Sequence, residues 1–345
     1  MRAKRRTNGT CVPVGCAPSS AQSCGPVDGL DGCGKLVQPP MSCSLRGGGQ
    51  ADDLTDKILA ILKEHDVFVT AEHVTPFAAE VQFRLGRRLE LHQWFATRGN
   101  FGTYDILGLI IDAKASDLDE ALWRAFLATH FGRLSAGQDR TKIESAGRFL
   151  YGFKDEPMWT WAHVSANREP LAVWLHAYME EVKKLAFGNH RKLEGKNDPQ
   201  HLYDVIVNFV AWVEVNGGSP TAAFDVPGAA TPQDRYKGLY SKLSGAWPRF
   251  RFGRLACFDL LDLLDKMELM EVKPNSCYVA NSSGPRRGAL KLCGLPRVDN
   301  PSKDIQVKMG RLADDVAERL DLPYAIVEDA LCCWQKEPAS ARAGG

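Results

Sequence analysis

The sequence predicts an all-α protein made of two lobes of bundled helices. Apolar residues recur at helical spacing in most segments after residue 50, and no stretch of any length shows strand-like alternation. The chain has 345 residues, of which 44% are hydrophobic and 25% charged, as in ordinary globular proteins. No run of about 18 apolar residues occurs, so we expect no membrane-spanning helix. We also expect a monomer.

The first 50 residues predict a disordered tail, because they are rich in Gly, Ser, Pro and Cys and lack apolar periodicity. Their basic start without acidic residues fits a transit peptide, an unstructured basic arm or a misassigned start. The compartment therefore stays open: intracellular, and nuclear or organellar in a eukaryote. Five of the 10 cysteines lie here without a C-x2-C pair, and the others have apolar surroundings. We expect free thiols, no metal and no cofactor.

One helical domain is predicted over 51–335, followed by a polar tail over 336–345. Its first helix carries an apolar stripe from Leu54 to Leu62. Ser116 is predicted to cap a helix whose first turn is acidic. A Pro/Gly/Ala-rich linker is expected over 219–232. The remaining helices are predicted over 77–97, 104–113, 143–151, 170–187, 202–215 and 255–270.

The segment 276–322 predicts a helix, a short loop and a second helix. Gly284 can adopt a positive φ, and the proline after it suits the first turn of a helix. Backbone N–H groups at such a start attract phosphate, and Arg286, Arg287 and Lys291 follow on the next turns. The pattern fits a DNA-phosphate site. It also fits an ordinary corner between helices with a solvated basic face.

The stretch 235–254 interleaves basic and aromatic residues. Arg249, Arg251 and Arg254 lie close to several tyrosine, tryptophan and phenylalanine residues. This combination suits neutralisation of a nucleic-acid backbone together with stacking on bases. The alternative is a loop whose aromatic side chains anchor it to the core. The formal net charge is only +1, so DNA binding rests on such local clusters.

Two carboxylates of the segment 276–322 are candidates for catalysis. Asp299 lies in the loop, and Asp304 opens the last helix pair. An acidic residue at a helix start also stabilises the helix dipole, so Asp304 has a structural alternative. No P-loop, no G-x-S-x-G motif and no histidine–cysteine zinc-deaminase pattern occurs in the sequence.

The run 284–323 resembles the helix-hairpin-helix core of DNA glycosylases. Asp304 stands where the catalytic aspartate of those enzymes begins its helix, and Asp299 offers a competing alignment. The chain departs from their pattern in three ways. A Ser-Ser-Gly-Pro turn replaces the usual Leu-Pro-Gly-x-Gly hairpin, no lysine occupies the nucleophile position of the lyase-type enzymes, and the iron–sulfur cysteines are absent.

Three further motifs are similar to the α-glutamyl/putrescinyl thymine pyrophosphorylase family, a glycosylase-like group also described as amino acid:DNA transferases. They are Arg-Phe-Gly-Arg with Phe-Asp-Leu-Leu within 251–261, Gly-Pro-Arg-Arg-Gly-Ala at 284–289, and Val-Glu-Asp-Ala-Leu-Cys at 327–332. The resemblance covers about 85–335. It implies an enzyme that replaces the diphosphate of 5-diphosphomethyl-uracil in DNA with an amine, so the partners would be DNA and an amine donor.

This chemistry assigns roles to residue types that the chain contains. Arginines would neutralise the departing diphosphate, and a carboxylate such as Asp304 would take a proton from the amine, with Asp259 as a second candidate. Two other functions stay open. A base-excising glycosylase would use the same carboxylate on the sugar or on water, and a non-catalytic helical module would only bind DNA.

Overall fold

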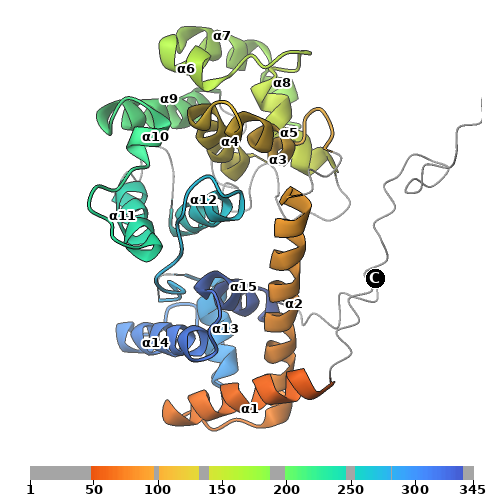
Figure 1. Cartoon of the computed structure of the whole chain (residues 1–345), viewed down its shortest axis with the longest axis vertical. Coiled ribbons are helices and arrows are strands. Elements are labelled where there is room, and N and C mark those ends of the chain that lie inside the picture. The colour runs from red at the N-terminus through yellow and green to blue at the C-terminus, as the bar shows by residue number, and fades with distance from the viewer. Residues whose placement is uncertain are drawn as a thin grey trace, which may run out of the picture. The chain divides into compact units, whose positions relative to one another are not determined.

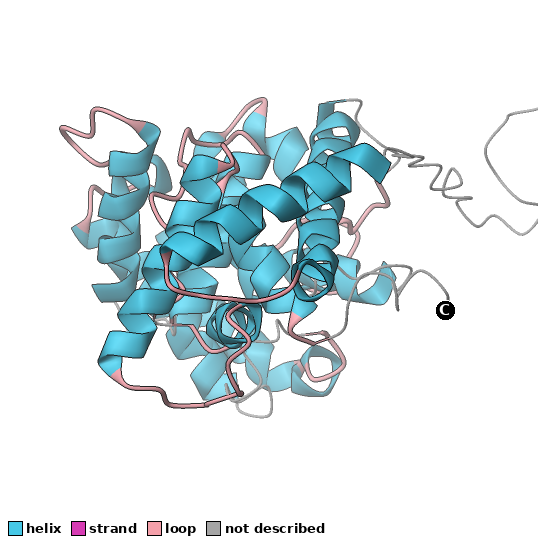
Figure 2. Ribbon diagram, turned by 90° about the horizontal axis from the view of Figure 1, so that it is seen from below, coloured by secondary structure: helices cyan, strands magenta, loops and turns pink. Residues whose placement is uncertain are grey.

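The computed structural model describes residues 48–96, 101–131, 140–186, 199–245, 253–280 and 282–336. In these segments every regular element is a helix, and loops join them (Figure 2). The predicted all-α class is therefore confirmed. The predicted tails, except for residues 48–50 and 336, and the candidate residues Arg249 and Arg251 lie outside the described residues.

Fifteen helices are present in the described part of the chain. The N-terminal ones are α1 (Gly48–Glu64), α2 (Ala71–Ala96), α3 (Ile106–Lys114), α4 (Leu118–His130), α5 (Arg140–Leu150), α6 (Trp161–Ala166), α7 (Glu169–Ala177) and α8 (Met179–Val182). They are followed by α9 (Pro199–Val215), α10 (Pro220–Ala223), α11 (Pro232–Gly245), α12 (Arg254–Lys266), α13 (Gly284–Leu292), α14 (Lys303–Arg319) and α15 (Tyr324–Trp334).

The described helices bury two hydrophobic clusters. One cluster is formed by α3 to α12 and contains most of the buried aromatic residues. The other is formed by α1, α2, α13, α14 and α15. The first and last parts of the chain therefore fold together, and α1 lies beside α14 (Figure 1). Burial of the apolar surface in these two clusters is the main contribution to the stability of the fold.

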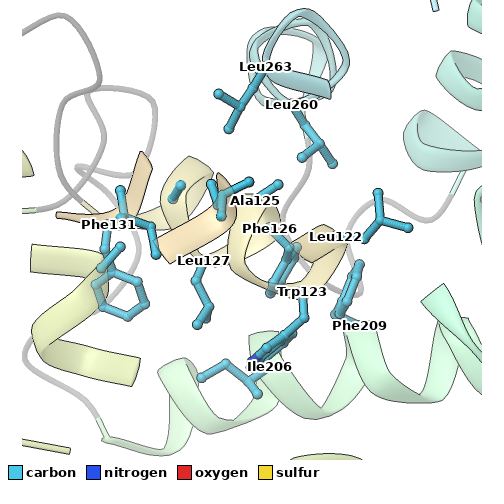
Figure 3. Packing of buried hydrophobic residues seen from close by; sticks show 14 of the residues in the cluster. Leu122, Trp123, Ala125, Phe126, Leu127, Phe131, Ile206, Phe209, Leu260 and Leu263 are labelled. Carbon is cyan, nitrogen blue, oxygen red and sulfur yellow. The ribbon is translucent and has the colours of Figure 1, made fainter. Parts of the chain in front are cut away.

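Helix α12 is fixed by its apolar side, which packs on α4. Leu260 and Leu263 point toward Leu122 and Ala125 (Figure 3). The spacing of apolar residues in α12 matches the 3.6-residue period, so the acidic residues between them point away from this contact. The packing thereby holds a row of carboxylates at the opposite side of α12.

Some predicted boundaries are wrong in detail. The predicted helix 170–187 is interrupted at Tyr178, which leaves helical dihedral angles and stacks its ring on Trp174. The expected linker 219–232 contains α10, capped by Ser219. Asp117, one residue after the predicted cap, accepts the hydrogen bond from Glu120 N–H and caps α4.

Other expectations concern cysteines and membranes. The five described cysteines are free; those at 257, 277 and 293 are buried, and those at 332 and 333 are half-buried. Within the segments that the structure describes, no helix combines the length and apolar character that crossing a membrane requires.

Candidate active site

The basic residues after the Ser-Ser-Gly-Pro turn are engaged with their own chain. Arg287 donates to the Asp299 carboxylate at 2.7 Å, and this bond holds the pKa of Asp299 below its usual range. Arg286 donates to the carbonyl oxygens of Asp299, at 2.7 Å, and of Ala280. Lys291 donates to the Trp334 carbonyl and lies 4.2 Å from the centre of its ring. These contacts fix the loop between α13 and α14.

The two glycines of Gly-Pro-Arg-Arg-Gly allow close packing of α13 on α15. A Cβ at Gly284 would lie 2.8 Å from Cys332 Sγ, and one at Gly288 would lie 2.1 Å from the carbonyl oxygen of Leu331. Gly284 does not have the positive φ that the sequence allowed, because it is already the first residue of α13. Its role in the fold is therefore close approach rather than a left-handed turn.

Asp304 lies exposed in the first turn of α14. The hydroxyl of Ser302 caps this helix by accepting from Ile305 N–H at 3.4 Å. An acidic residue at this position stabilises the helix dipole. The structure thus gives Asp304 the helix-start position that the sequence predicted, on the same loop-and-helix segment as Asp299.

A second charged group lies at the start of α12 and is much more enclosed. Arg254 donates to the Glu328 carboxylate of α15 at 2.8 Å and to the Cys277 carbonyl at 3.2 Å. Glu328 is only 5% exposed. Burial raises the pKa of Glu328 to about 7, although Arg254 opposes this shift. The contact joins two segments whose motifs were singled out in the sequence.

Asp259 lies five residues after Arg254 on α12 and is half-buried. Burial first, and then the charges of Glu328 and Asp262, raise the pKa of Asp259 to about 8, with Arg254 opposing. A carboxyl group with such a pKa exchanges its proton near neutral pH, as a general acid or base must. Of the three predicted carboxylates, Asp259 is the one whose pKa is raised toward neutral pH.

The rest of the charged side of α12 is paired with α2. Arg88 donates to Asp262 at 3.0 Å and also to Asp265, and Lys266 lies 2.5 Å from Asp262. The two cations keep the pKa of Asp262 below its usual value despite its burial. Asp262 is therefore held ionised next to Asp259 and helps to keep Asp259 protonated.

Tyr278 lies in a tight turn before α13, directly after Cys277, whose carbonyl oxygen accepts from Arg254. Tyr278 has φ +50°, a left-handed conformation that a bulky residue rarely adopts. The Asp314 carboxylate of α14 holds the turn by accepting from Cys277 N–H at 2.6 Å and from Ser276 Oγ at 2.9 Å. The ring of Tyr278 stacks on Tyr240 with 4.3 Å between centroids.

The sequence did not identify four of these residues as site residues: Glu328, Tyr240, Tyr278 and Asp314. The motif at 327–332 contained Glu328, and the Arg/aromatic stretch contained Tyr240, but neither residue was singled out as a site residue. A carboxylate in an otherwise apolar helix face is the signal that could have identified Glu328. Tyr278 and Asp314 carry no such signal, because their roles depend on the fold of a turn.

In a comparison with known proteins, the chain matches one protein family. No curated protein and no solved structure matches it significantly. Residues 87–342 match the family described as alpha-glutamyl/putrescinyl thymine pyrophosphorylase clade 3. The match covers Arg254, Asp259 and Glu328 as well as the segment from Gly284 to Asp304. The chain therefore belongs to the alpha-glutamyl/putrescinyl thymine pyrophosphorylase family, as the sequence motifs predicted.

Proposed function

We propose that the protein modifies thymine-derived bases in DNA by replacing the diphosphate of 5-diphosphomethyl-uracil with an amine. Membership of the thymine pyrophosphorylase family supports the substrate class. The observation that carries the proposal is Asp259, half-buried beside Arg254 and Glu328 with a pKa raised to about 8. A duplex base must leave the stack to reach such an enclosed carboxylate.

The reaction needs a neutral amine and a stabilised leaving group. In its ionised form Asp259 accepts the proton that the amine loses as its nitrogen bonds to the methylene carbon. The carbon–oxygen bond breaks at the same carbon, and diphosphate leaves with the electron pair. Cations that face the departing oxygens stabilise this charge. Arg254 begins α12, and the predicted Arg249 and Arg251 precede it in sequence.

Asp304 and Asp299 remain predicted alternatives for the base. Both belong to the segment that resembles the glycosylase hairpin, and Gly284, Arg286, Arg287 and Lys291 remain its predicted phosphate contacts. Asp299 accepts two hydrogen bonds from Arg287, which lower its pKa and make it a weak base. We therefore assign the base role to Asp259 and a DNA-positioning role to the hairpin.

The test incubates the full chain with duplex DNA bearing 5-diphosphomethyl-uracil and with glutamate or putrescine, amines chosen from the family description. We expect pyrophosphate release and a new amine-linked nucleoside in the mass spectrum. Asp259→Asn should lower the rate by about 10²- to 10⁴-fold, the usual contribution of a general base. Asp304→Asn is the matched control and should retain most of the rate.

Other products would identify another function. A free base or an abasic site would indicate a base-excising glycosylase. Binding to DNA without any product would indicate a non-catalytic module. Loss of pyrophosphate release in Asp304→Asn, with Asp259→Asn active, would move the base to the hairpin.

A further inference from the structure

The aromatic residues beside the charged group form a cluster with two unusual members. Tyr236 is fully buried, yet its hydroxyl has no hydrogen-bond partner. The Nε of Arg254 is also buried without a partner, although the other two nitrogens of its guanidinium are bonded. Buried polar groups are nearly always paired, and each unpaired one costs free energy. Two such donors in one cluster are available to the acceptor atoms of a ligand.

The rings around Tyr236 provide an apolar environment for a flat ligand. Tyr240 lies 6.2 Å and Tyr278 lies 5.8 Å from its ring centroid, and Phe258 closes another side at 6.2 Å. Burial raises the pKa of Tyr236 well above the usual value, and the charges of Asp262 and Arg254 also affect it. The Tyr236 hydroxyl therefore remains a neutral donor within electrostatic reach of the Arg254 guanidinium.

Tyr278 is held in this cluster against its own backbone preference. Its left-handed φ is maintained by the hydrogen bonds from the turn to Asp314 and by the bond from its hydroxyl to Asn275 at 2.7 Å. Its ring is half-buried and stacks on Tyr240. Strained residues that several contacts hold in place are concentrated at ligand-binding sites.

We propose that Tyr236, Tyr240, Tyr278 and the Arg254 Nε form a subsite for an extruded pyrimidine with two ring carbonyls. Arg254 Nε can only donate, and the Tyr236 hydroxyl can donate, so the pair matches the two carbonyl oxygens of a uracil-type ring. Arg254 Nε would face the carbonyl that cytosine replaces with an amino group, which cannot accept its hydrogen, so cytosine leaves this donor unpaired. The Tyr236 hydroxyl would donate to the carbonyl that both bases share. Tyr278 stacks on the base as it stacks on Tyr240. The inference rests on the proposed function, for which it names the recognition of the base.

The test measures binding without turnover. Duplex oligonucleotides carry 5-hydroxymethyl-uracil or 5-hydroxymethyl-cytosine opposite an abasic position, so that no base pair opposes extrusion. Fluorescence anisotropy gives the affinity of the full chain for each duplex. We expect the uracil-type base to bind more tightly. Tyr236→Phe should weaken binding of both duplexes about five-fold, the effect of one hydrogen bond. Tyr104→Phe, in which the altered hydroxyl donates to the Lys154 carbonyl oxygen instead, should leave both affinities unchanged.

Tyr278 gives an independent readout. Tyr278→Leu should weaken binding of both duplexes about ten-fold without changing their ratio, because stacking does not distinguish bases. Tyr278→Phe keeps the ring and should restore the affinity. Equal affinity of the wild type for both duplexes, or unchanged affinities in Tyr236→Phe, would overturn the subsite. A preserved preference in a protein that releases no pyrophosphate would leave the subsite intact and refute the proposed reaction.

Discussion

The hairpin and the start of α12 each pair an arginine with a carboxylate, but in different surroundings. The Arg287 and Asp299 side chains are 28% and 64% exposed, whereas those of Arg254 and Glu328 are 13% and 7% exposed. Water screens the first pair, and the pKa of Asp299 is lowered. Burial dominates the second pair and raises the pKa of Glu328. An arginine–carboxylate pair therefore stabilises a loop in one place and contains a carboxyl group with a raised pKa in the other.

The largest expected effect comes from breaking the buried pair. Arg254→Met would leave the Glu328 carboxylate and the Cys277 carbonyl without their donor. Removing one partner of a buried ion pair costs about 3–5 kcal/mol of folding free energy. Urea denaturation at pH 8.5, where Glu328 is ionised, measures this loss. The matched change Arg287→Met should have little effect, and an equal loss in both variants would contradict the difference in burial.

Much of the fold was predictable because helical periodicity and the residues that begin and end helices are local signals. The apolar stripe of α1, the acidic first turn of α4 and the start of α13 all appear in the sequence at the expected places. The interruption at Tyr178 was not predictable, because it depends on packing of its ring against Trp174, which is a tertiary contact.

The candidate site was less predictable than the fold. Asp304 has the sequence context of a helix start, and the structure gives it that position. Asp259 has no special local context. Its raised pKa arises from burial and then from the charge of Glu328, 69 positions later in the chain. Gly288 belongs to the Gly-Pro-Arg-Arg-Gly-Ala motif, but its close contact with the Leu331 backbone is evident only in the fold. Residues that act through long-range contacts require the fold to be known.

A smaller expected effect is that the two regions contribute differently to the pH dependence of folding stability. The pKa of Asp259 is about 8 in the folded chain, whereas an unfolded aspartate titrates near 4. Between these values the unfolded chain releases the proton and the folded chain keeps it, so Asp259 lowers stability as pH rises. Relative to wild type, Asp259→Asn should gain at least about 1 kcal/mol of folding free energy between pH 4 and pH 8.

Asp299→Asn should show the opposite dependence. The Arg287 bond lowers the pKa of Asp299, so its stabilising contribution is present above the unfolded pKa and disappears as pH falls through the folded pKa. Thermal denaturation across pH 3–9 compares the two variants. Parallel pH profiles would mean that Asp259 does not titrate differently from an exposed carboxylate.

The smallest expected effect is an increase in folding stability. Tyr236→Phe removes a hydroxyl that is buried and unpaired in the free protein, so the variant should be more stable by about 1 kcal/mol. Urea denaturation of wild type, Tyr236→Phe and the control Tyr104→Phe measures the change; the control loses a bonded hydroxyl and should gain nothing. A less stable Tyr236→Phe would mean that the hydroxyl already has a partner. Higher stability with poorer recognition of the base is the pattern of a group kept for a ligand rather than for the fold.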